Sequence, residues 1–127
     1  MKIQESGENY LEAILLLEDE RHRVRAVDIA NALGVSKPSV TRAMGVLKKA
    51  GYIVQESYGD ISLTEEGRRR AGDVLSRHRL IQEFLMLSVG VDAETAGQDA
   101  CRIEHVISVE TAEGMQRYVA AHRDQKR

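Results

Sequence analysis

The sequence predicts a mainly α-helical protein that contains one small β-hairpin. Leu, Ala, Glu and Arg are plentiful, there is a single Pro and there is no Trp, a composition that favours helices. Apolar residues recur at helical spacing along most of the chain, and they alternate with polar residues around Gly59-Asp60. With 127 residues, of which 43% are apolar, the chain can bury a core and form one domain or two small ones.

The only cysteine, Cys101, excludes an internal disulfide framework and is typical of a reducing compartment. The N-terminal segment is not expected to be a signal peptide, because its apolar run is short and lies between Glu12 and Glu18. No stretch is long enough to span a bilayer. We therefore expect a cytoplasmic protein without a membrane partner.

Residues 8–17, ENYLEAILLL, predict the first helix. Its apolar stripe consists of residues at helical spacing, namely Tyr10, Ala13, Ile14 and Leu17. Asn9 and Glu12 lie three positions apart on a neighbouring face of this helix. The polar run EDERHRVR that follows predicts a break.

Residues 26–53 have the pattern of a helix-turn-helix. A short first helix ends at Gly34, where the chain must turn sharply. Ser36 can cap the second helix, and Pro38 sits in its first turn, where the missing N–H does no harm. The second helix should end at Gly51. Its buried stripe is expected to be Val40, Met44 and Leu47.

The second helix of this pair is a candidate DNA-reading helix because all its charged residues are basic. The formal net charge of −2 argues by itself against a nucleic-acid binder, but charge is unevenly spread: from Val91 to Met115 every charged residue except Arg102 is acidic. The residues expected near base edges or phosphates are Ser36, Lys37, Pro38, Ser39, Thr41 and Arg42. Arg42 is the best candidate to read a guanine, and Pro38 to touch a thymine methyl. The alternative is an ordinary helical hairpin whose basic face is solvated.

Residues 52–64, YIVQESYGDISLT, predict two short strands with a tight turn at Gly59-Asp60. A hairpin directly after a reading helix makes a wing, which can reach a phosphate or a minor groove. A simple ribbon that closes the core is the alternative, and both roles can hold at once.

Three helices are expected in the second half of the chain. Thr64 should cap a long helix that reaches Leu87 and carries His78 on or beside its apolar stripe. Two further helices are expected over residues 93–107 and 108–122, with Ser108 as the cap of the last one.

Four residues of the second half are of types that bind late first-row divalent metals: His78, Cys101, Glu104 and His105. On one helix the last three would share a face. A second helix must complete such a site, and His78 with the Asn9/Glu12 pair can do so. The alternatives are a buried Cys acting as a small hydrophobe and a solvated Glu-His pair. No phosphate loop, nucleophile elbow or HExxH pair occurs, so we expect no enzyme and no organic substrate.

Over nearly its whole length the chain resembles the diphtheria toxin repressor and manganese transport regulator family of metal-dependent bacterial repressors. Four segments carry the resemblance, and the last two are the more specific: ENYLEAILLL, VDIANALGVSKPSVTRAMGVLKKAGYI, SRHRLIQEFL and DACRIEHVIS. The resemblance implies a winged helix-turn-helix DNA-binding domain over residues 1–70 and a helical metal-binding and dimerisation domain over residues 71–127. It also implies a homodimer that binds palindromic operator DNA when Fe2+ or Mn2+ is present.

The resemblance also assigns metal ligands, at Glu12, His78, Cys101, Glu104 and His105. Asn9 departs from the Asp or Met that the family commonly has there, and its amide oxygen would be an uncharged donor. Cys101 resembles iron-responsive members and Glu12 manganese-responsive ones, so iron and manganese both remain open. Gln82 and Gly97 stand where iron-type members have acidic and His ligands, so an ancillary site there should be weak or altered. Co2+, Ni2+ or Zn2+ should substitute in vitro.

As a mechanism, we expect the ion to clamp the first helix to the helices that carry His78 and Glu104, thereby setting the spacing of two reading helices for half-sites about 34 Å apart. A rival hypothesis is a winged-helix regulator that senses oxidants through Cys101, with Glu104 and His105 tuning its reactivity.

Overall fold

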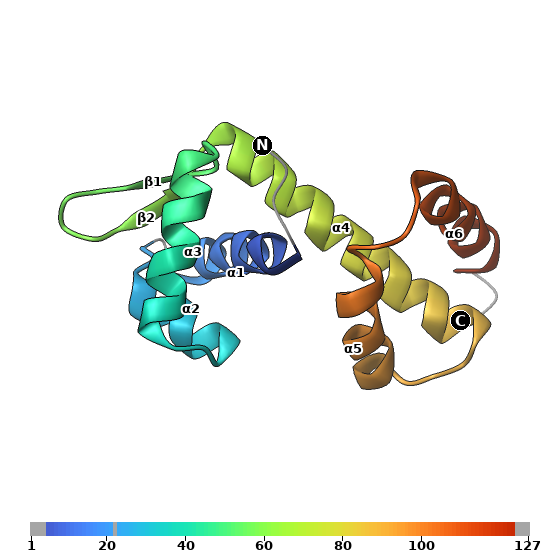
Figure 1. Cartoon of the computed structure of the whole chain (residues 1–127). Coiled ribbons are helices and arrows are strands. Elements are labelled where there is room, and N and C mark those ends of the chain that lie inside the picture. Colours follow the sequence, from blue (N-terminus) through green and yellow to red (C-terminus); the bar gives the residue numbers. More distant parts are fainter. Residues whose placement is uncertain (1–4, 22, 124–127) are drawn as a thin grey trace. The chain divides into compact units, whose positions relative to one another are not determined.

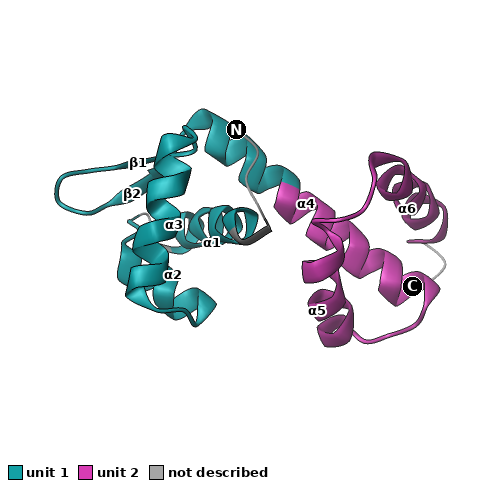
Figure 2. Cartoon of the chain, in the orientation of Figure 1, with its two compact units in different colours: residues 1–73 teal, residues 74–127 magenta. Residues whose placement is uncertain are grey.

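The computed structural model describes residues 5–21 and 23–123, and in these residues it has six helices and one two-stranded sheet (Figure 1). In chain order these are α1 (Glu5–Arg21), α2 (Ala26–Leu33), α3 (Lys37–Lys49), β1 (Ile53–Gln55), β2 (Ile61–Leu63), α4 (Glu65–Ser88), α5 (Ala93–Ile103) and α6 (Val109–His122). The predicted fold class, mainly helical with one small hairpin, is confirmed. The chain divides into two compact units, residues 1–73 and 74–127 (Figure 2).

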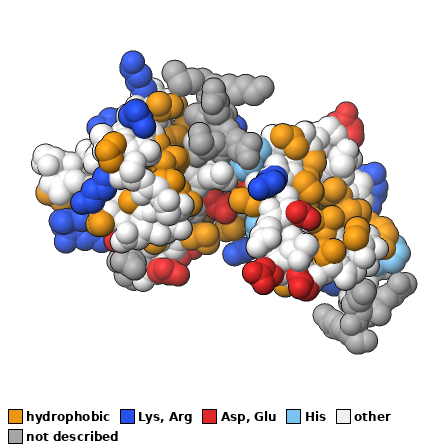
Figure 3. Space-filling model, turned by 60° about the horizontal axis from the view of Figure 1, so that its bottom comes forward, with side chains coloured by type: hydrophobic (Ala, Val, Ile, Leu, Met, Phe, Trp, Pro, Cys, Tyr) orange, Lys and Arg blue, Asp and Glu red, His pale blue; other side chains and the backbone are white. Residues whose placement is uncertain are grey.

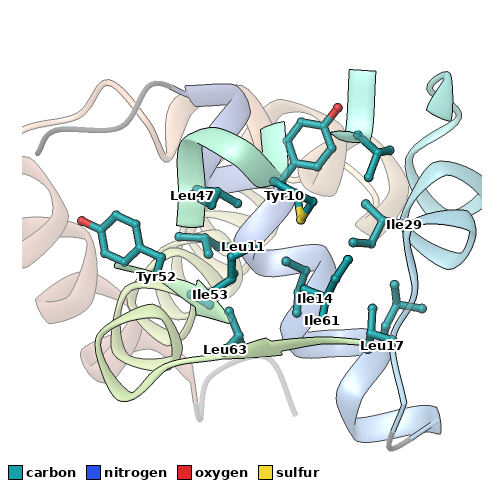
Figure 4. Close-up of a cluster of buried hydrophobic side chains, with 14 of the residues drawn as sticks. Tyr10, Leu11, Ile14, Leu17, Ile29, Leu47, Tyr52, Ile53, Ile61 and Leu63 are labelled. Atoms are coloured by element: carbon teal, nitrogen blue, oxygen red, sulfur yellow. The ribbon is translucent and has the colours of Figure 1, made fainter. Parts of the chain in front are cut away.

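The first unit is built around a core to which α1, α2, α3 and the hairpin all contribute (Figure 4). The predicted stripe of α1 is buried, and Leu11 beside it is fully buried as well. However, α1 does not break after Leu17 but continues to Arg21. Glu18 accepts a hydrogen bond from the backbone N–H of Leu63 at 3.2 Å and pairs with Arg68 at 2.8 Å. Residues far along the chain thus stabilise a polar helical turn whose composition alone predicts a break in the helix.

The helix-turn-helix forms as its local signals predict. Gly34 adopts the left-handed conformation with φ 67°, and the Ser36 hydroxyl accepts a hydrogen bond from the backbone N–H of Ser39 at 3.3 Å. The three residues predicted for the buried stripe of α3 are 0–2% exposed: Val40, Met44 and Leu47. This stripe fixes which face of α3 is turned to solvent.

The hairpin has a longer connection than the predicted tight turn at Gly59-Asp60. Its strands pair antiparallel with Ile53 opposite Leu63, and the backbone N–H of Glu56 donates to the Asp60 carbonyl at 2.9 Å. The turn lies before Asp60, and Gly59 has a φ of 99° that favours glycine.

A third short segment joins the hairpin, since the N–H of Ile61 donates to the carbonyl of Val24 at 2.8 Å. The Asp60 carboxylate pairs with Arg23 at 2.8 Å and with Arg25 at 3.3 Å. The hydrogen bond from Arg23 is the main reason that the pKa of Asp60 lies below its usual value. The turn end of the wing is therefore anchored to residues 23–25, which precede α2.

The long helix α4 begins directly after Thr64, whose hydroxyl accepts a hydrogen bond from the N–H of Gly67 at 3.1 Å. It ends at Ser88, one residue beyond the prediction. Ser108 caps α6 as predicted, accepting from the N–H of Thr111 at 3.1 Å. The expected helix over 93–107 is too long, because α5 ends at Ile103 and a turn follows. Ser108 must be extended to act as a cap, so the chain has to leave the helical path before it. Within the described residues, no helix is long and apolar enough to cross a membrane.

Candidate metal centre and nucleic-acid interface

The exposed face of α3 collects the residues that we predicted to contact DNA. Ser39 is partly buried. The other five are exposed: Ser36, Lys37, Pro38, Thr41 and Arg42. The hydroxyls of Ser36 and Ser39 lie 2.9 Å apart in the helix cap, and the Thr41 hydroxyl donates to the carbonyl of Lys37 at 3.1 Å. These three hydroxyls thus have a structural role. Among the six residues, Lys37 and Arg42 are therefore the ones whose side chains α3 offers to a polyanion.

Positive charge is concentrated on α3, where every charged residue is basic and exposed: Lys37, Arg42, Lys48 and Lys49. Figure 3 shows several Lys and Arg side chains on the first unit and a group of Asp and Glu side chains on the second. The all-basic segment that the sequence predicts therefore lies on the surface of the first unit. A basic helix of this kind supplies favourable electrostatics for the phosphate backbone of DNA.

In the second unit, Glu104 lies between two histidines. His78 Nδ1 on α4 is 3.1 Å from Oε2 of Glu104, and His105 Nε2 is 3.2 Å from Oε1. The side chains of Glu104 and His105 are 0% and 2% exposed, and that of His78 is 21% exposed. Three of the predicted metal ligands are thus brought together within one unit, from two segments of the chain.

This group suits a divalent cation by its chemistry. A carboxylate removed from water is stabilised by cations or hydrogen-bond donors, and imidazole and carboxylate are both ligands for Fe2+ and Mn2+. The two imidazoles approach different oxygens of Glu104 instead of a common point. In keeping with this, no group of three or more His, Cys, Asp and Glu side chains in residues 5–21 and 23–123 is arranged to hold an ion. Metal binding would compete with protons for the imidazole nitrogens.

Cys101 does not share the burial of Glu104, although a helix would place both on neighbouring positions of one face. Cys101 is exposed and borders a shallow hollow that Gln98, Asp99 and Arg102 also line. The buried stripe of α5 runs through Ala96 and Ala100 and reaches Glu104 after a further four residues. One residue past Ala100, Cys101 is turned about 100° away from that stripe. Its role as a ligand stays a prediction.

The other two predicted ligands, Asn9 and Glu12, lie on α1 in the first unit, and both are partly buried. Their neighbour Glu8 is buried and accepts hydrogen bonds from Arg70 at 2.8 and 3.0 Å. Neither this ion pair nor the Glu18–Arg68 pair can be predicted from the sequence, because partners 62 and 50 residues apart leave no local signal. Together the two pairs fasten α1 to the first turns of α4.

Gln82 and Gly97 lie close together in the second unit. The Gln82 amide donates to the carbonyl of Ala93 at 2.9 Å, and a Cβ on Gly97 would come within 3.1 Å of the Gln82 nitrogen. This pair thus holds the start of α5 against α4, which is a structural function.

Two family models cover most of the chain. Residues 2–61 match the description "Iron dependent repressor, N-terminal DNA binding domain", and residues 64–125 match "Iron dependent repressor, metal binding and dimerisation domain". The chain belongs to the iron dependent repressor family. The predicted resemblance is confirmed, and the order of a DNA-binding domain followed by a dimerisation domain agrees with it.

Individual relatives of the family are similar over most of the chain. An uncharacterised HTH-type transcriptional regulator, MJ0568 of Methanocaldococcus jannaschii, is 33% identical over 96% of this chain and 98% of its own length. The HTH-type transcriptional regulator MntR of Geobacillus kaustophilus is 40% identical over 81% of this chain and 72% of its own length. The structure of the manganese regulator SloR is 25% identical with a TM-score of 0.81, covering 94% of this chain; the chain spans only 55% of SloR.

Proposed function

We propose that this chain is a metal-dependent transcriptional repressor that binds palindromic operator DNA as a homodimer, with Fe2+ or Mn2+ as the co-repressor. Residues 1–70 would bind DNA, and residues 71–127 would bind the metal and form the dimer. The relatives are transcriptional regulators, and in keeping with them we propose neither an enzymatic activity nor an organic substrate. A repressor acts on chromosomal DNA, so its place would be the cytoplasm.

The buried carboxylate of Glu104, placed between His78 and His105, is the observation that carries the proposal. A buried ionised carboxylate is costly unless cations or hydrogen-bond donors compensate it. An ion held by Glu104 and the two imidazoles would supply that charge. Glu12 and Cys101, and Asn9 as an uncharged donor, complete the proposed ligand set on the strength of the resemblance.

The choice between iron and manganese depends mostly on Cys101. A thiolate ligand favours Fe2+, Co2+ or Zn2+ over Mn2+, whereas carboxylate and imidazole accept either ion. The matched family is described as iron dependent and SloR as a manganese regulator. We therefore propose Fe2+ as the first candidate if Cys101 takes part, and Mn2+ if it does not.

The proposal is tested by anaerobic titration of operator binding with Fe2+ and with Mn2+, followed by fluorescence anisotropy. The probe is a duplex that the chain has selected from a random-sequence library in the presence of Mn2+. Operator affinity should rise by about 5–150-fold, the usual range for coupling between two binding sites. Operator binding that is the same with metal and with chelator would refute the co-repressor role.

The redox alternative is separated by the same assay. If Cys101 senses oxidants, peroxide should change operator binding in the presence of chelator, and Cys101→Ser should abolish that change. The exposed position of Cys101 is compatible with oxidation, but the relatives give this reading no support.

Arg42→Ala should relax sequence preference. The exposed Arg42 guanidinium can bind the O6 and N7 of one guanine, so its loss should reduce discrimination at one base pair by about 1–3 kcal/mol. Competition with single-base operator variants measures this. Lys48→Ala is the matched control: it should weaken binding to all sequences alike and reduce the salt slope by about 1. Equal losses on every duplex for Arg42→Ala would show that Arg42 contacts only phosphate.

A further inference from the structure

Gly45 lies in the middle of α3, and packing within the fold does not require a glycine there. It is exposed, and a Cβ built there would meet no atom within 4 Å. In contrast, a Cβ on Gly67 in α4 would overlap the carbonyl oxygen of Tyr52, so that glycine is required by packing. Glycine in a helix interior lowers stability relative to alanine because it adds backbone freedom to the unfolded chain. The fold alone would therefore favour Ala at position 45.

The position of Gly45 on α3 places it on the face of the helix that is turned to solvent. The buried stripe runs through Val40, Met44 and Leu47, and at about 100° per residue Gly45 lies well away from it. Gly45 follows Thr41 by four residues and Arg42 by three, so all three share the exposed face. Lys48 and Lys49, also exposed, follow in the next turn. The helix thus presents bare backbone in the centre of its basic face.

We propose that Gly45 is the point at which the backbone of α3 lies against operator DNA, and that its missing side chain sets how deeply α3 enters the major groove. This inference rests on the proposed function, since it requires that α3 reads DNA. A glycine allows a ligand to approach the backbone more closely than any other residue does. The depth matters for Arg42 one turn earlier, because hydrogen bonds to base edges weaken within a few tenths of an ångström.

Gly45→Ala should therefore have opposite effects on stability and on DNA binding. Its melting temperature should rise by about 3–6 °C, because a helix-interior Gly is replaced by Ala in open space. Its affinity for the library-selected operator in saturating Mn2+ should fall by about 5–150-fold, as expected when one bidentate base contact is lost. Unchanged or tighter operator binding would overturn the proposal. A lower melting temperature would overturn it as well, because Gly45 would then be required by the fold.

Gly72→Ala is the matched control. Gly72 lies in α4, and a Cβ there also meets nothing within 4 Å. This variant should gain similar stability and bind operator like the wild-type chain. Failure of the proposed function would show differently: the wild-type chain would bind operator, but its affinity would not respond to Mn2+. In that case the difference in operator affinity between the wild-type chain and Gly45→Ala would still test the role of Gly45. A wild-type chain that binds neither the operator nor a random-sequence duplex of the same length would overturn both proposals.

Discussion

Glu104→Gln is expected to abolish the metal response of operator binding. The substitution keeps the size of the side chain and one acceptor oxygen for an imidazole, but it removes the buried negative charge that His78 and His105 surround. Without that charge the proposed site loses its strongest attraction for a divalent cation. The rise of about 5–150-fold in operator affinity on adding Mn2+ or Fe2+ should disappear. Anisotropy titrations, together with metal analysis of the dialysed protein, measure both steps.

Glu113→Gln controls for the change in net charge. Glu113 is an exposed residue of α6, so its substitution should leave both metal content and the metal response unchanged. Circular dichroism of Glu104→Gln should still show the helices, since replacing a buried carboxylate by a neutral amide lowers the cost of desolvation. A Glu104→Gln protein that still binds stoichiometric metal and responds to it would rule out Glu104 as a ligand.

The parts of the fold that the sequence predicts are those specified by short-range rules. The turn at Gly34 and the caps at Ser36, Thr64 and Ser108 follow from the residue type and the next few positions, and all four form as expected. The buried stripe of α3 follows from helical periodicity. His78, Glu104 and His105 could be selected, together with Cys101, because all four are of types that bind divalent metals and because the family resemblance assigns them.

What the sequence could not predict depends on partners distant along the chain. The extension of α1 to Arg21 relies on Glu18 meeting Leu63 and Arg68, and the pairing of Arg23 and Arg25 with Asp60 fixes the wing. The exposure of Cys101 has a similar origin. Periodicity places it beside Glu104, but the path of the buried stripe through Ala96 and Ala100 depends on what packs against α5. Such pairings become visible only in three dimensions.

Leu47→Ala is expected to destabilise the first unit by about 2–5 kcal/mol, a large part of the roughly 5–15 kcal/mol that keeps a typical protein folded. Leu47 is 0% exposed and belongs to the core that holds α3 against α1 and the hairpin (Figure 4). Thermal and urea unfolding measure the loss. Val46→Ala is the control, because Val46 is 53% exposed and its truncation should cost less than about 0.5 kcal/mol.

The apparent operator affinity of Leu47→Ala should fall only because a smaller fraction of the protein is folded. Leu47 is buried, and the exposed residues of α3 are unchanged. Lowering the temperature to well below the midpoint of unfolding should therefore restore binding. Arg42→Ala should show no such recovery, because it removes an exposed group from a folded helix. If Leu47→Ala binds operator weakly even when fully folded, the core must also determine the orientation in which α3 presents Arg42.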